Sequence, residues 1–62
     1  MEIKFVRDVF GNGWYVNPDH IVYAAKIEKP EEVFKATGSN KLKKCYVLHM
    51  TNGQTFVIEN MI

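Results

Sequence analysis

The fold is decided by residues 43–59, which read KKCYVLHMTNGQTFVIE. Two runs rich in β-branched and aromatic residues, 43–50 and 54–59, flank the turn residues Thr51-Asn52-Gly53, a pattern typical of a β-hairpin. A two-residue Asn-Gly turn would leave both faces of the hairpin similarly apolar. A three-residue turn, with Gly53 in the left-handed region, separates a core face from a surface, so we predict that register.

In this register the large apolar residues share one face of the hairpin: Tyr46, Leu48, Met50, Phe56 and Ile58. The opposite face carries smaller and more polar residues: Cys45, Val47, His49, Thr55, Val57 and Glu59. The first set is the predicted core, because side chains alternate between the two faces of a strand.

A second hairpin is predicted at the start of the chain. Residues 2–7 alternate, with Ile3 and Phe5 on one side, as in a half-buried strand. Residues 8–13 contain two glycines around an asparagine, and residues 14–17 resume the alternation. We therefore expect Ile3 and Phe5 to lie on the buried side of this hairpin.

Residues 20–28, HIVYAAKIE, form the next predicted strand. The turn Asn17-Pro18-Asp19 leads into it, and β-branched and aromatic residues outweigh the helix-forming pair Ala24 and Ala25. Alternation places four residues on one face: Ile21, Tyr23, Ala25 and Ile27.

Residues 29–42 break the strand pattern and predict a long loop or a helical turn. Pro30 suits the first turn of a helix, Glu31 and Glu32 suit its positive end, and Gly38 can stop it.

The chain of 62 residues accommodates one small all-β domain, residues 1–62. Five short antiparallel strands favour an SH3-like or Sm-like barrel, with an antiparallel meander as the alternative. No apolar stretch approaches the length of a membrane span and no leader is evident, so we expect a cytoplasmic protein.

The sequence provides little for catalysis. The only cysteine, Cys45, excludes an internal disulfide, and with His20 and His49 it shows no metal-ligand spacing. The glycines at 11 and 13 lack the helix that a phosphate-binding loop requires. We expect no enzymatic activity, no metal and no cofactor.

The leading hypothesis is a protein-binding module that regulates or inhibits a larger cytoplasmic protein. Net charge is +1, and apolar residues are left over on predicted strand faces. The predicted contact residues are Trp14, Tyr15, Val47, His49 and Val57. Self-association into a homo-oligomer is a further alternative.

Binding to nucleic acid is the other alternative, since lysines can meet phosphates while aromatic rings stack on bases. The residues that would carry it are Lys35, Lys41, Lys43, Lys44 and Tyr46. The competing interpretation is a solvated cluster of lysines that discourages pairing at a strand edge.

Two runs carry a family resemblance: WYVNPDHI at 14–21 and VLHMTNGQTFV at 47–57. In this order they resemble the FlbD/SwrD-like family of small flagellar proteins, which have a Y-L/V-N-P-D-x-I segment followed by an L-T-N-G-x hairpin. The same rhythm is similar to the C-terminal part of LytTR-type DNA-binding domains. The resemblance implies a small, non-enzymatic regulatory protein of bacterial or phage origin.

Overall fold

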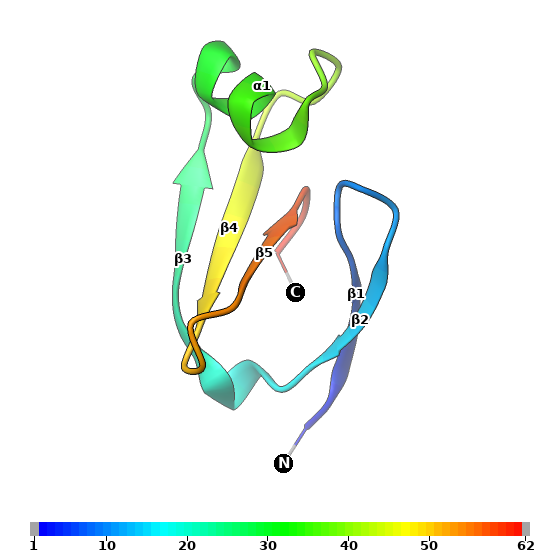
Figure 1. Ribbon diagram of the computed structural model, residues 1–62, viewed down its shortest axis with the longest axis vertical. Helices are drawn as coiled ribbons and strands as arrows, with labels where there is room; N and C mark the ends of the chain where they lie inside the picture. Colours follow the sequence, from blue (N-terminus) through cyan, green and yellow to red (C-terminus); the bar gives the residue numbers. More distant parts are fainter. Residues whose placement is uncertain (1, 62) are drawn as a thin grey trace.

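The computed structural model describes residues 2–61 as two antiparallel sheets with one short α-helix (Figure 1). Strands β1 (Lys4–Arg7) and β2 (Gly13–Val16) form a hairpin. A three-stranded sheet in the order β3-β4-β5 follows, built from β3 (Ile21–Ile27), β4 (Cys45–Met50) and β5 (Thr55–Ile58). The antiparallel, mostly-β class is confirmed. The described strands form two separate sheets and not a closed barrel.

The turn between β4 and β5 has the predicted register. Leu48 lies opposite Phe56, and the Met50 amide donates a 2.9 Å hydrogen bond to the carbonyl of Gln54. Gly53 has a φ of 86°, the left-handed conformation that glycine adopts without steric cost. The three-residue turn is therefore confirmed.

The hydrophobic core lies between the hairpin and the three-stranded sheet. Its buried members come from both sheets: Val6, Val16, Leu48, Phe56 and Ile58. Ile21, Tyr46 and Met50 pack against it. We call the side of the three-stranded sheet that carries Leu48 the inner face, and the opposite side the outer face.

The predicted buried side of β1 is wrong. Val6 is the buried residue, while Ile3 and Phe5 are more than half exposed. The Phe5 ring instead covers Gly13 on the solvent side of the hairpin, where a Cβ on Gly13 would lie 2.6 Å from the ring. Phe5 also packs edge-on against Tyr15, at 5.3 Å between ring centroids. Alternation alone fits either side, and contact of Val6 with the core selects the other one.

A β-bulge in β3 breaks the predicted four-residue face. Ile21 lies opposite Met50, but the register shifts before Tyr23, which lies opposite His49. Ile21 therefore packs on the core, whereas Tyr23, Ala25 and Ile27 lie on the outer face. The extra residue, Val22, lies between Ile21, which faces the core, and the residues that face outward.

Two helical turns connect the strands. The 3₁₀ helix η1 (Pro18–His20) joins β2 to β3, and the Asn17 side chain accepts a 3.0 Å hydrogen bond from the Asp19 amide. Helix α1 (Pro30–Thr37) lies at the end of the sheet where β3 ends and β4 begins (Figure 1). Gly38 ends α1 in the left-handed conformation, at a φ of 72°, as predicted.

Candidate functional site

The candidate site is the outer face of the β3–β4–β5 sheet. Besides Cys45 and Thr55, register places six residues of the three strands on it: Tyr23, Ala25, Ile27, Val47, His49 and Val57. The four aliphatic residues among them are half-buried, yet none belongs to the core or packs against it. The outer face is therefore a mostly apolar surface that the hairpin does not cover.

An aromatic pair lies at the β3 side of the outer face. The rings of Tyr23 and His49 stack at 4.2 Å between centroids with an angle of 13° between their planes. Tyr23 is more than half exposed, so the pair is accessible from solvent. The sequence analysis selected His49 but not Tyr23, because the sequence does not reveal that β3 pairs with β4 in the register that places Tyr23 opposite His49.

Cys45 also belongs to the outer set by register but is fully buried. Burial raises the pKa of its thiol above the ordinary value of 9.0, which disfavours the reactive thiolate. Val33 and Thr37 of α1 are buried as well, and α1 lies at the end of β4 that carries Cys45. The outer face is therefore buried at the Cys45 end of β4, and its other residues are at least partly exposed.

The structure separates Trp14 from Tyr15. The Trp14 ring lies 5.2 Å from that of Phe56, and its Nε1 donates a 2.8 Å hydrogen bond to Asp8. Tyr15 points to the opposite side of the hairpin and is 79% exposed. Of the five predicted contact residues, only Val47, His49 and Val57 share one surface.

Asp8 organises the loop that supports Trp14. Besides the Trp14 indole, its carboxylate accepts 2.9 Å hydrogen bonds from the amides of Phe10 and Asn12. The indole bond first, and then the amide bonds, hold the pKa of Asp8 below its usual value. The carboxylate thus has a structural role in this loop.

The residues predicted to bind nucleic acid lie on different elements of the structure. Lys41, Lys43 and Lys44 are exposed in the segment before β4, while Lys35 lies on α1. The Lys44 ammonium lies over the ring of Tyr46, 5.7 Å from its centroid, and Tyr46 packs on the core. The ring that would stack on a base is thus half-buried and already contacts the protein's own side chains.

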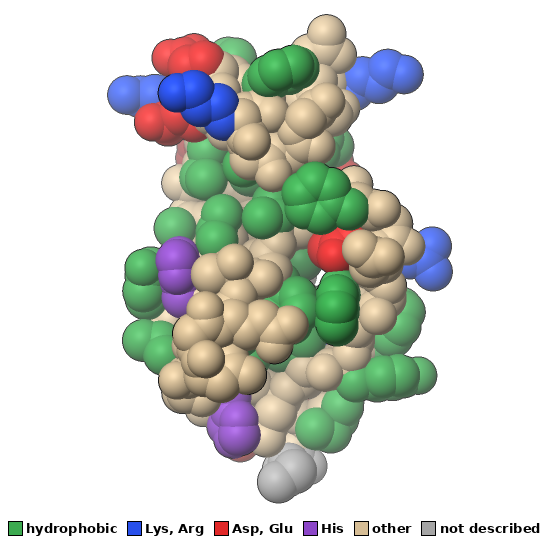
Figure 2. All heavy atoms as spheres, in the orientation of Figure 1, with side chains coloured by type: hydrophobic (Ala, Val, Ile, Leu, Met, Phe, Trp, Pro, Cys, Tyr) green, Lys and Arg blue, Asp and Glu red, His purple; other side chains and the backbone are tan. Residues whose placement is uncertain are grey.

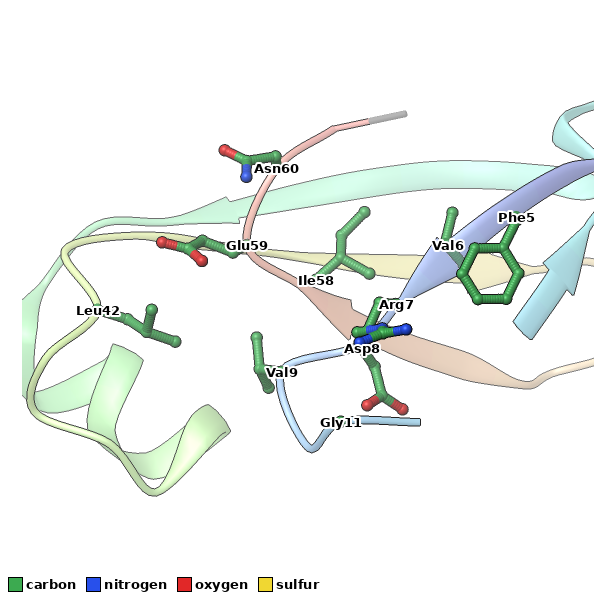
Figure 3. Close-up of a pocket in the computed structure, with 10 residues that line it drawn as sticks. All are labelled: Phe5, Val6, Arg7, Asp8, Val9, Gly11, Leu42, Ile58, Glu59 and Asn60. Carbon is green, nitrogen blue, oxygen red and sulfur yellow. The ribbon is translucent and has the colours of Figure 1, made fainter. Parts of the chain in front are cut away.

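A surface depression of about 490 Å³ lies between the end of β1 and the end of β5 (Figure 3). Val9, Leu42 and Ile58 form its apolar wall, with Arg7 and Asp8 beside them. Among residues 2–61, no three His, Cys, Asp or Glu side chains are grouped so that they could hold a metal ion. The Asp8 carboxylate in the lining of the depression is bonded to the amides of Phe10 and Asn12 and to the Trp14 indole.

Charged side chains gather mainly at the end of the molecule that carries α1, as Figure 2 shows for one face. Hydrophobic and uncharged side chains occupy most of the remainder of that view. Within the part of the chain that the structure describes, no helix has the length and apolar character needed to cross a membrane. No protein-family model, curated protein or solved structure matches the chain.

Proposed function

We propose that this protein is a non-enzymatic protein-binding module that regulates or inhibits a larger partner protein, and that the outer face is its binding surface. The observation that carries the proposal is the uncovered apolar face around Val47, His49 and Val57. The centres of protein interfaces are depleted of charge and enriched in aromatic residues, and the Tyr23–His49 stack fits this description.

The setting we propose is a bacterial or phage protein acting in the cytoplasm. Support comes from the unpaired thiol of Cys45 and from the resemblance to FlbD/SwrD-like proteins. The order of the five strands, a hairpin followed by a three-stranded meander, further favours an open relative of the SH3-like arrangement.

The test compares two apolar-to-acid variants at opposite sides of the molecule. Val47→Asp introduces a charge at the centre of the outer face, and Ile3→Asp introduces one at an exposed residue next to β1. Capture from host lysate treated with nuclease, read by mass spectrometry, should recover a protein with the wild type and with Ile3→Asp. With Val47→Asp, the amount of this protein captured should fall at least about tenfold, which corresponds to a loss of about 1.4 kcal/mol of binding free energy.

Circular dichroism of Val47→Asp provides the control for folding. Equal capture by a folded Val47→Asp and by the wild type would rule out the outer face as the binding surface.

Nucleic-acid binding is the second candidate, supported by the three lysines between residues 41 and 44. Reversal of all three to glutamate should abolish gel retardation of DNA or RNA at low salt, and wild-type binding should weaken steeply as salt rises. A flat salt response of the wild type, or no retardation, would exclude it.

A further inference from the structure

One edge of the three-stranded sheet is formed by β3, the longest of the described strands. The Met50 amide bonds to Gln54, so the even-numbered residues of β4 direct their main-chain groups toward β5. The odd-numbered residues of β4 therefore bond to Tyr23, Ala25 and Ile27. The N–H and C=O groups of Ala24 and Lys26 consequently point away from the sheet.

The two edges of the three-stranded sheet differ. The outer edge of β5 faces the hairpin, and the Val57 carbonyl accepts a 2.9 Å hydrogen bond from the amide of Val9 (Figure 1). β3 lies at the opposite edge with no strand beside it among the described residues. An edge of this kind is a template for another strand.

We infer that β3 pairs with β3 of a second copy of this chain, antiparallel and centred on Ala24, to form a continuous six-stranded sheet across a two-fold axis. This register places Ala24 opposite Ala24 of the second copy, Tyr23 opposite Ala25, and Val22 opposite Lys26. The inference goes beyond the proposed function, because the new contact is made by the main-chain edge of β3, and of the outer-face residues only Tyr23 and Ala25 take part in it.

The choice of a second copy rests first on self-complementarity. Tyr23 and Ala25 form a pair that is not hydrogen-bonded across the new edge, the type in which facing side chains lie closest. A large ring thus meets a small side chain twice across the axis. Lys26 meets Val22 and not another lysine, and its own ammonium already pairs with Glu28 at 3.0 Å.

A single copy also exposes more surface than a compact protein of its mass. The accessible surface is 4522 Å². A compact monomer of 7.2 kDa is expected to expose about 4100 Å². Pairing with a second copy would cover part of the excess. A chain this small usually needs a disulfide, a metal or an oligomer for stability, and a single cysteine excludes an internal disulfide.

The open edge is protected against unlimited association. The bulge at Val22 and the charge of Lys26 limit the pairing to a short stretch. Once the two β3 strands pair, the remaining edges are those of β5, beside the hairpins. The assembly therefore closes as a dimer, as expected for an isologous interface.

The first test is equilibrium sedimentation over about two decades of concentration, chosen because small interfaces bind weakly. The wild type should change from monomer to dimer. Ala24→Pro removes an N–H that makes no bond to β4, so the variant should stay folded and monomeric. Ala24→Ser retains this N–H and should dimerise like the wild type.

The second test reads the register through charge and remains decisive if Ala24→Pro does not fold. Val22→Lys places two lysines opposite each other and should weaken the dimer at least about fivefold, whereas Val22→Glu should preserve or tighten it. Combining Val22→Lys with Lys26→Glu should restore the dimer.

Three results would overturn the inference: a wild type that is monomeric at every concentration, a dimer indifferent to a folded Ala24→Pro, or equal dimerisation by Val22→Lys and Val22→Glu. Loss of the dimer only in Val47→Asp would assign self-association to the outer face instead. Failure of partner capture leaves the dimer unaffected, so the two proposals fail separately.

Discussion

The inner and outer faces of the three-stranded sheet carry similar side chains and have different surroundings. On β4, Leu48 faces inward and is fully buried, while its neighbour Val47 faces outward and is half-buried. Val6 and Val16 of the hairpin belong to the same buried cluster as Leu48. The aliphatic residues of the outer face have no such partners in the core.

This difference teaches that apolar character along a strand does not by itself identify a core. The core is the face that a second element covers, here the β1–β2 hairpin. The apolar face left uncovered is the natural place for a partner, because exposed apolar patches of this kind mark interaction surfaces.

The largest effect is expected from truncating the inner face. Leu48→Ala should lower the free energy of unfolding by about 2 to 5 kcal/mol, through lost burial and the cavity that remains. The whole domain is stabilised by only about 3 to 9 kcal/mol, so this loss is a large fraction of its stability.

Val47→Ala is the matched change on the outer face and should cost about 1 kcal/mol or less, because less apolar surface is lost from a half-buried position. Urea unfolding followed by circular dichroism measures both variants. Equal losses for Leu48→Ala and Val47→Ala would show that the outer face is as well packed as the inner one, which contradicts the comparison.

An intermediate effect is expected from the turn that assigns residues to the two faces. Gly53→Ala forces a Cβ into the left-handed region and should cost about 1 kcal/mol. Gly53→Asn should cost less, because asparagine enters this region more readily. Thermal unfolding of the two variants gives the ranking, and an alanine variant as stable as the wild type would show that the turn does not require this conformation.

The smallest effect is expected from the loop that supports Trp14. The folded pKa of Asp8 is lowered, so its contribution to stability is present above the ordinary pKa of 3.8 and is lost as pH falls through the folded value. Asp8→Asn should therefore flatten the acid limb of the stability curve, because it has no carboxylate to protonate.

Asp19→Asn, at an exposed carboxylate of η1, is the control and should retain the acid limb. Tryptophan fluorescence during acid titration reports directly on Trp14, the only tryptophan. An unchanged acid limb in Asp8→Asn would show that ionisation of Asp8 contributes nothing to stability.

Several elements were predictable because their signals are local. Gly53 and the apolar runs on either side determine the β4–β5 register through the geometry of a single turn. Pro30 and Gly38 mark the ends of α1 through their own backbone preferences, and Asn17 closes the turn before β3 with its side chain. Val47, His49 and Val57 followed from that register, so half of the candidate site was found from the sequence.

Only the tertiary structure decided which side of each remaining strand is covered. Alternation in β1 allowed Phe5 or Val6 to face inward, and packing against the three-stranded sheet selected Val6. The bulge at Val22 moved Tyr23 to the outer face, because one extra residue reverses the alternation that follows. The sequence by itself therefore determined the strands and turns, whose causes lie within a few residues. The covered and uncovered faces depend on contacts between distant segments, which no local pattern encodes.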